Sequence, residues 1–473
     1  MAQPALTPPM PAAENEPAID LAPAARRPLA RLIARVKAIL ADRSDSRLAQ
    51  LGAGQVFLVR VVNALLALVT QVLFARWMGS FEFGIYIYVW TWVLMIGGLS
   101  DMGLSSAARR FIPEYTEHKA FDSLRGFLAG SRWIAFGTAT AIAVLGALGV
   151  LAMAPYLDHF TVIPLYLACA VLPIYGVVQV QAGIAQSYDW PNLAMLPFYI
   201  IRQIAITAGL GAAYLLGMAT DAVTAMIVVI VCTWGVTVGQ MLMLNRRLGS
   251  KVPHGRKQYE VKTWLGTSMP ILMVEFFYML LTYVDILALE QFGTPDDVAV
   301  YFAGARLLAI VAFVYYAIAN ATTHKFTAYH VAGDTARLKS FFAETTRWTF
   351  WPSLAVCIAI LALGKPLLAL FGAEFGRGYA VMFILAVGML ARAAVGPAER
   401  LLNMLGVRKQ CAAIYAGAFA INLGLCVILI PRFGIEGAAI ATTSALIFES
   451  ALLYVVAKHR LGFHVFILGN PKD

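Results

Sequence analysis

The residues of this chain that could do chemistry are the few ionisable side chains inside its long apolar segments. They include Arg60, Arg202, Arg306, Arg392, Glu275, Asp285 and Glu449. A charge at the centre of a bilayer costs about 3 kcal/mol or more, so each of these groups should face the protein interior, a partner of opposite charge or water. A guanidinium donates a planar fork of hydrogen bonds that fits phosphate oxygens, so the arginines are candidates for binding a phosphate-bearing substrate. Arg–carboxylate pairs that lock helices together are the alternative.

The apolar segments that carry these charges have the length of membrane-spanning helices, about 20 residues each. They are 52–76, 84–104, 127–152, 161–183, 193–217, 222–244, 265–289, 299–322, 347–364, 379–397, 411–430 and 436–457. With 60% hydrophobic and only 13% charged residues, the chain has far more apolar surface than a soluble core could absorb. In lipid every backbone polar group must be satisfied within the spanning element. We therefore predict an all-α, polytopic membrane protein with about twelve transmembrane helices.

The basic residues predict the orientation of the chain in the membrane. Of the 36 Lys and Arg, 28 lie in or beside the two tails and the breaks after even-numbered spans, and four lie in the other breaks. Because positive charge marks cytoplasmic loops, both termini are expected in the cytoplasm. The net charge of +10 then reflects topology and contact with anionic membrane lipids, and it does not indicate nucleic acid as a partner.

An internal repeat appears when the sequence is aligned with itself at an offset of 215 residues. Phe111 then meets Phe326, and Phe127 meets Phe342. The offset carries spans 1, 2 and 3 onto spans 7, 8 and 9, so the two halves of six spans share one orientation. We predict two six-helix bundles related by an axis along the membrane normal, an arrangement that usually places a substrate site between the halves.

The expected division of the chain follows from these spans and from the tails. It consists of a cytoplasmic tail at 1–50, an N-terminal bundle at 51–244, a cytoplasmic linker at 245–264, a C-terminal bundle at 265–457 and a second tail at 458–473. The first tail contains an apolar pattern from Pro28 to Arg43 that is typical of an amphipathic helix in the membrane interface. Alternatively, this segment is a partly ordered stretch before the first span and has no role of its own.

Catalytic and cofactor motifs have no evident place in the sequence. There is no Ser/His/Asp set or nucleotide-binding loop in a plausible context, and the five cysteines lie in spans without metal-ligand spacing. We therefore expect no enzyme activity, no cofactor and no metal. A membrane-embedded polysaccharide polymerase or ligase usually carries a sizeable periplasmic loop, whereas the largest periplasmic break expected here is about 365–378.

Several motifs resemble one known family over about 52–457. The segment from Phe74 to Gly79 (FARWMG), followed by the FGIY of Phe83 to Tyr86, is similar to the first-span signature of polysaccharide-exporting flippases. Further similarities are DMGL at Asp101, RRFIPE at Arg109, Asp285 with Gly293 and Val300-Tyr301, and PRFGIEGAAIAT at Pro431. The resemblance implies the multidrug/oligosaccharidyl-lipid/polysaccharide (MOP) exporter superfamily, with its MATE-like fold, in the branch of O-antigen and exopolysaccharide repeat-unit flippases.

Members of that branch move undecaprenyl-diphosphate-linked oligosaccharide across the cell inner membrane, alongside polysaccharide polymerase and export machinery. The related lipid II flippase uses arginines of its first and eighth spans, which implies Arg60 and Arg306 here, and Arg202 near mid-membrane is a third candidate. A cation-coupled multidrug antiporter on the same fold is the main alternative. It would need an acidic first bundle, whereas Asp101 is the only acid within spans 1 to 6.

Energy for transport would come from an ion gradient, from the membrane potential or from consumption of the product, since no nucleotide-binding motif is present. Glu275, near the middle of span 7 and beyond a bend expected at Pro270, is the first candidate for ion coupling, and Asp285 is the second. Simple neutralisation of an arginine is the alternative for Glu275. The tryptophans near span ends, such as Trp90 and Trp264, are interpreted as interface anchors.

Overall fold

The computed structural model describes residues 45–405, 407–462 and 464–467. The amphipathic helix expected from Pro28 to Arg43 lies outside these residues. The chain divides into two compact units, Met1–Gly54 and Gln55–Asp473, and the second unit contains the membrane helices.

The described residues are almost entirely helical. The long helices are α2 (Asp45–Gly97), α3 (Leu104–Glu117), α4 (Phe121–Met153), α5 (His159–Ser187), α7 (Arg202–Leu215), α8 (Ala222–Gly249), α9 (Val261–Phe292), α10 (Pro295–Leu308), α11 (Val311–Val331), α12 (Thr335–Ala362), α14 (Tyr379–Ala394) and α16 (Arg408–Leu461). Shorter elements are η1 (Ala154–Tyr156), α6 (Pro191–Met195), the π-helical η2 (Leu196–Ile201), α13 (Gly364–Ala369), η3 (Ala373–Gly378) and α15 (Ala398–Met404).

Seven of the described helices are long and apolar enough to cross a membrane, or nine if each of two bent pairs is one span. Two of the seven, α2 and α16, are divided by Gly79 (φ 78°) and Gly434 (φ 55°), where the backbone is not helical. Glycine suits these turns because other residues are strained at positive φ. The nine spans become eleven when the two arms of α2 and the two arms of α16 are counted separately. Addition of α12 gives the twelve predicted spans.

Local sequence explains where the spans begin. At the start of α10, Thr294 and Asp297 form a capping box, with Pro295 in the first turn. At the start of α8, the Asp221 carboxylate accepts a hydrogen bond from the Thr224 backbone nitrogen at 2.8 Å. In α9, the segments Val261–Pro270 and Glu275–Phe292 meet at 52°, so the bend expected near Pro270 is present.

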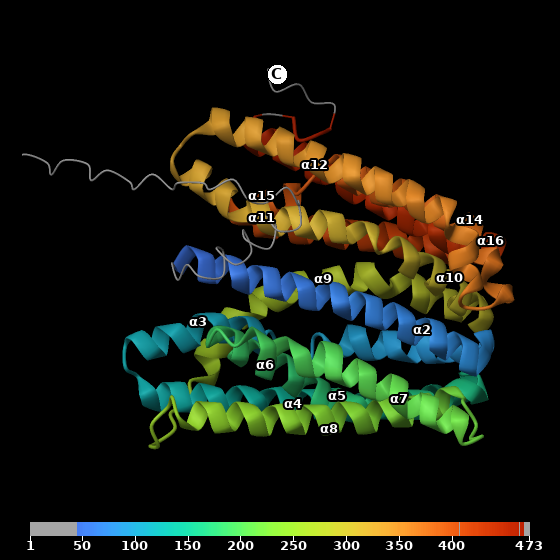
Figure 1. The fold of residues 1–473 in the computed structure, drawn as a ribbon, viewed down its shortest axis with the longest axis horizontal. Helices are drawn as coiled ribbons and strands as arrows, with labels where there is room; N and C mark the ends of the chain where they lie inside the picture. The colour runs from blue at the N-terminus through green and yellow to red at the C-terminus, as the bar shows by residue number, and fades with distance from the viewer. Residues whose placement is uncertain (1–44, 406, 463, 468–473) are drawn as a thin grey trace, which may run out of the picture. The chain divides into compact units, whose positions relative to one another are not determined.

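The membrane helices form two groups with α2 and α9 between them in the view of Figure 1. The repeat is visible in the packing, because Phe111 and Phe127 lie 5.7 Å apart between ring centroids at 44°, and Phe326 and Phe342 lie 5.6 Å apart at 37°. Residues 215 positions apart thus make the same contact in both halves. The predicted two-bundle fold is confirmed.

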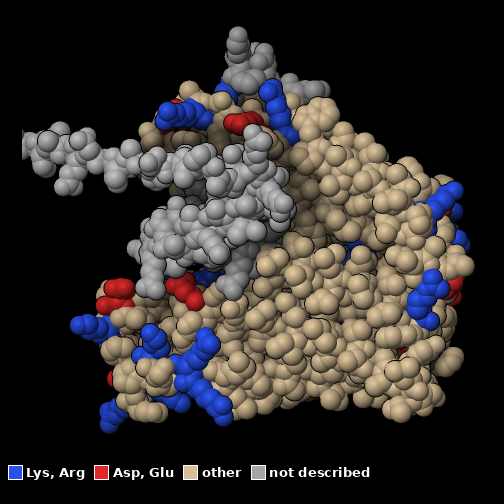
Figure 2. Space-filling view, in the orientation of Figure 1, with Lys and Arg blue, Asp and Glu red and all other residues tan. Residues whose placement is uncertain are grey.

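The surface has the composition expected of a membrane protein. On the face drawn in Figure 2, charged side chains gather at the two ends of the helices, and a broad band without charge lies between them. Large apolar side chains are exposed along α4, including Leu145 (68%) and Leu151 (63%). Such a contiguous apolar surface has to be covered by lipid.

The two halves contact each other closely at the end where Gly79 lies. Arg76 donates two hydrogen bonds to the carbonyl oxygens of Ala369 and Leu370, at 2.6 and 2.7 Å. Four residues beyond Arg76, the Ser80 hydroxyl donates to the Asp296 carboxylate. A Cβ added at Gly84 would lie only 1.8 Å from the Pro295 carbonyl oxygen, so α2 and α10 touch backbone to backbone. We call these contacts the closed end.

At the start of α9, Trp264 is fully buried, so its interpretation as an interface anchor is wrong. Its ring meets Phe127 edge-on at 5.2 Å, and its indole nitrogen donates to the Tyr115 hydroxyl at 3.0 Å. Burial raises the pKa of Tyr115, whose hydroxyl donates in turn to Glu260 at 3.1 Å. The first segment of α9 is therefore fixed to the N-terminal half, although the helix belongs by repeat to the C-terminal half.

Candidate functional site

A cavity of about 300 Å³ lies between the two halves. We call it the central cavity. Helices α2, α5 and α7 with the π turn η2 line it from one half, and α9 and α10 line it from the other. Its lining includes the polar residues Asn63, Thr70, Gln71, Thr91, Gln179 and Gln203 and the aromatic residues Tyr86, Trp90, Tyr175, Phe198, Tyr199 and Tyr283.

Two predicted substrate-binding residues, Arg202 and Arg306, face this cavity from opposite halves. Among its described lining residues, none is acidic. The cavity therefore carries an excess of positive charge that its own walls do not neutralise. Such a site attracts anions, because Coulomb forces are stronger in a partly dehydrated cavity than in water.

Arg202 is the more deeply placed of the two arginines, with only 8% of its surface exposed. Its guanidinium carbon lies 4.2 Å from the centroid of the Phe198 ring and 5.2 Å from that of Trp90, and its Nε donates to the Phe198 carbonyl oxygen at 3.3 Å. Its Nη1 is buried and has no hydrogen-bond partner among the described residues. Buried donors are usually satisfied, so this nitrogen is available to a ligand atom or a water molecule.

A local irregularity places Arg202. The chain runs through Pro197 in the π-helical turn η2 (Leu196–Ile201) and enters α7 at Arg202 itself. Such turns insert an extra residue into a helix and are frequent at functional sites. As a result, the Phe198 ring lies beneath the guanidinium of Arg202, four residues later in the chain.

Arg306 lies in the last turn of α10 and is half-buried. The helix ends at Leu308, and α11 continues from Val311 at an angle of 44°. A cation near a helix C-terminus is stabilised by the helix dipole, so this position favours a charged guanidinium.

The third predicted arginine, Arg60, is exposed on α2 and is not among the residues that line the central cavity. It lies about one turn before Asn63, which does line it. No ion pair joins it to another described residue. The structure thus brings Arg202 and Arg306 together and leaves Arg60 outside.

The two predicted coupling residues have different surroundings. Asp285 is buried and accepts hydrogen bonds from the Tyr301 hydroxyl at 2.6 Å, the Thr442 hydroxyl at 3.1 Å and the Ile286 backbone nitrogen at 2.8 Å. Glu275 is half-buried and forms no ion pair within 4 Å with any described residue, although Arg109 is near enough to interact with it electrostatically.

A separate charge cluster locks helices of the C-terminal half. The Arg392 guanidinium lies 3.5 Å from the Glu449 carboxylate and 3.6 Å from that of Glu399. Glu449 is completely buried, and Arg392 also lies over the Tyr315 ring at 5.5 Å. These contacts match the helix-locking alternative for Arg392, whereas Arg202 and Arg306 have no such ion pair with a described residue.

Three features were missed in the sequence: two of them line the central cavity, and the third, Glu290, does not. Trp90, interpreted as an anchor, lines the central cavity beside Arg202, and Gln71 presents a buried, unpartnered Oε1 to it. Glu290 on α9 is half-buried with an unpartnered Oε2. A polar residue in an apolar run was the only signal available for Gln71 and Glu290.

Comparison with known proteins gives a family and a fold. The family model described as polysaccharide biosynthesis protein matches residues 52–323. No curated protein sequence matches the chain. An inward-facing multidrug resistance MATE family transporter of the MOP superfamily aligns with a TM-score of 0.70 at 16% identity, over 86% of this chain and 98% of its own.

Two further solved structures share the fold. The lipid II flippase MurJ, in an inward closed conformation, aligns with a TM-score of 0.67 at 15% identity, over 85% of this chain and 87% of its own. A MOP superfamily transporter from Pyrococcus furiosus, whose reverse pocket polarity suggests a different function, aligns with a TM-score of 0.64 at 14% identity, over 87% and 95%. At these identities the likeness establishes the MATE-like fold alone.

Proposed function

Because this chain belongs to the polysaccharide biosynthesis protein family, we propose that it is a flippase for lipid-linked oligosaccharide. It moves undecaprenyl-diphosphate-linked repeat units across the cell inner membrane for O-antigen or exopolysaccharide biosynthesis. The observation that supports this substrate is the central cavity, which contains Arg202 and Arg306 and no acidic residue among its described lining.

The charge of the cavity matches a diphosphate. Hydrogen bonds between charged groups contribute about 1.5–3 kcal/mol each, and the unpartnered Nη1 of Arg202 is available for one. Arg306 lies on the opposite wall, so each half of the protein can bind one of the two phosphates. The guanidinium is suited to this task because its planar fork grips two oxygens at once.

The same charge disfavours the multidrug antiporter. Two unit charges of equal sign 4 Å apart repel by about 4 kcal/mol at an effective dielectric constant of 20, so a cationic drug would be rejected. The acid that an antiporter would need in the first half is also engaged elsewhere. Both Asp101 carboxylate oxygens accept backbone hydrogen bonds, from Gly103 and Ser105 at 3.0 Å, at the start of α3.

The remaining lining suits the sugars next to the diphosphate. Amide and hydroxyl groups can pair with sugar hydroxyls, and the aromatic rings offer flat apolar faces. At about 300 Å³ the cavity is at the lower end for ligand sites, so it holds the diphosphate and its nearest sugars. The polyprenyl tail stays in the bilayer, and longer repeat units enter as the halves separate.

Alternating access requires the halves to exchange contacts at their two ends. The closed end, where Arg76, Ser80 and Gly84 meet the other half, is the barrier on one side of the cavity. Rocking of the bundles 51–244 and 265–457 about the linker 245–264 would open it. From the distribution of Lys and Arg we place the closed end on the periplasmic side and both termini in the cytoplasm.

In this scheme Arg202 and Arg306 contact the diphosphate, and Arg60 attracts it at the cytoplasmic entrance. Glu275 is the coupling residue, since Asp285 is held by three hydrogen-bond donors. The polymerase and export machinery that consume the repeat units are the expected partners.

Deletion of the gene tests the proposal. One surface glycan should disappear while its lipid-linked precursor accumulates inside the cell, and the wild-type gene should restore export. Unchanged glycans together with increased sensitivity to cationic drugs would overturn the proposal in favour of the antiporter. A lipid-linked repeat unit that reaches the periplasm but is not joined into chains would indicate a polymerase instead.

A further inference from the structure

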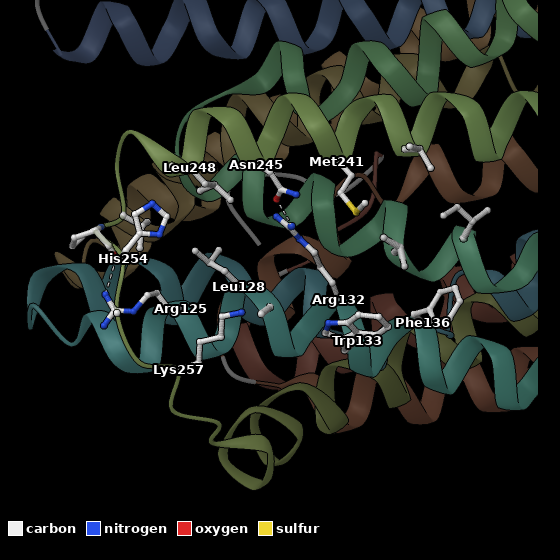
Figure 3. A pocket seen from close by; sticks show the side chains of 18 of the residues that line it. Arg125, Leu128, Arg132, Trp133, Phe136, Met241, Asn245, Leu248, His254 and Lys257 are labelled. Atoms are coloured by element: carbon white, nitrogen blue, oxygen red, sulfur yellow. Dashed lines mark hydrogen bonds between the residues drawn. The ribbon is translucent and has the colours of Figure 1, made fainter.

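A second, larger cavity lies on the outer side of the N-terminal half, and its lining shares no residue with that of the central cavity. It has a volume of about 680 Å³ and lies between α4 and α8, with α5 as its floor and residues 252–257 as its end wall. Figure 3 shows Arg132 from α4 and Lys257 from the linker among its lining residues. We call it the α4–α8 groove.

Arg132 is the polar centre of the groove. Its Nη1 donates to the Asn245 Oδ1 at 2.6 Å, which joins α4 to α8, as the dashed line in Figure 3 shows. Its Nε and Nη2 are buried and have no hydrogen-bond partner among the described residues. No acidic side chain is among the described residues that line the groove. Two buried donors of this half-buried arginine therefore remain for an anion.

The end wall of the groove is a built structure. Arg125 donates to the carbonyl oxygens of Arg256 at 2.7 Å and Pro253 at 2.8 Å, so it fixes the linker and is not available to a ligand. A Cβ at Gly126 would lie 1.6 Å from the Gln258 carbonyl oxygen, and only glycine permits this approach. These contacts hold Lys257 beside the groove.

The lining changes character along the groove. Arg132 and Lys257 lie toward the linker, and apolar side chains from α4, α5 and α8 continue away from it, including Phe136, Ile174, Val177 and Trp234. Trp133, at the edge of the groove, is 72% exposed on the surface that lipid must cover. A ligand that matches this lining has an anionic head and an apolar chain.

We propose that the α4–α8 groove binds one anionic phospholipid, with its phosphate on Arg132 and Lys257 and an acyl chain along α5. The phosphate is the chemistry that the basic residues recognise, and the apolar floor selects a lipid over free phosphate. Basic pockets between transmembrane helices on the cytoplasmic side are suited to anionic lipid head groups. The groove does not depend on the substrate of the central cavity.

Native mass spectrometry of the purified full chain, titrated with phosphatidylglycerol, phosphatidylcholine or inorganic phosphate, tests this inference. In R132Q/K257Q we expect the affinity for the first phosphatidylglycerol to fall at least about tenfold, because charge-assisted hydrogen bonds are lost. The control R246Q/K251Q removes the same charges from exposed positions nearby that do not line the groove, and it should bind like the wild type.

Equal loss of affinity in both variants would overturn the inference, since only general surface charge would then be acting. Equally tight phosphatidylcholine binding by the wild type would remove the role of the anionic head. Displacement of phosphatidylglycerol by millimolar inorganic phosphate would show an anion site without lipid selectivity, which also contradicts it. An unchanged melting temperature of R132Q/K257Q in detergent without added lipid would exclude misfolding as the cause of a loss.

Discussion

Replacement of Arg202 by methionine should stop transport and stabilise the protein at the same time. Arg202 is 8% exposed, and no described carboxylate pairs with it. An unpaired buried charge costs roughly 5 kcal/mol after relaxation. Two contacts with aromatic rings, at 4.2 and 5.2 Å, return about 1 kcal/mol each, and the long hydrogen bond to Phe198 returns about 1 kcal/mol.

A cost of about 2 kcal/mol therefore remains without substrate, and methionine removes it while keeping a long apolar stem in place. R202M should raise the Tm in detergent by about 2 °C or more. Tryptophan fluorescence during a thermal ramp measures this shift, and export of the surface glycan measures function.

R392M is the matched control because Arg392 is paired. Removal of its guanidinium leaves Glu449 completely buried without its counter-charge, which should destabilise the protein by about 3 kcal/mol or more. Opposite signs of the two Tm shifts are thus expected from the same substitution. A fall in Tm for R202M as large as that for R392M would refute a ligand-binding role and make Arg202 a structural residue.

Three further predictions concern movement, coupling and topology. In G84V the new Cβ would lie only 1.8 Å from the Pro295 carbonyl oxygen, so the variant should be unable to close this end. Cross-linking of S80C/D296C should then be at least about tenfold slower than in a protein that keeps Gly84. Unchanged cross-linking would contradict the closed-end assignment. E275Q should transport without dependence on an imposed pH gradient in proteoliposomes, and a folded variant with normal dependence would exclude Glu275 as the coupling residue. Reporter fusions after residues 80, 157, 294 and 372 should show periplasmic activity, and cytoplasmic activity at most of them would refute the orientation.

Much of the fold could be predicted from the sequence, because an uncharged apolar segment of about 20 residues is typical of a membrane-spanning helix. The repeat was accessible for a different reason: Phe111 and Phe127 recur 215 residues later as Phe326 and Phe342, and each pair makes the same contact in its half. The breaks at Gly79 and Gly434 fall inside the predicted gaps between spans, at 77–83 and 431–435. The residue at which the backbone turns was not predicted, because neither glycine is distinguished from the chain's other glycines by sequence alone.

The site was accessible only in part. Arg202 and Arg306 were found because a charge inside an apolar run requires a reason, but the same criterion selected Arg60, which lies outside the central cavity. Trp90 was misinterpreted because position along a helix does not reveal which face meets a cavity. Arg132 was counted with the charges in and beside the loops, and only the structure shows that it bonds to Asn245 and has two buried nitrogens without a partner.

Movement of a defined lipid-linked glycan in proteoliposomes tests the anion-binding role of the central cavity most directly. The wild type should flip a polyprenyl-diphosphate-linked glycan faster than its monophosphate analogue, and a neutral polyprenyl glycoside least. R202Q/R306Q should lower the diphosphate rate at least about a hundredfold, because two charge-assisted contacts are lost. Equal rates for the neutral and diphosphate lipids, or a wild-type rate in R202Q/R306Q, would contradict that role.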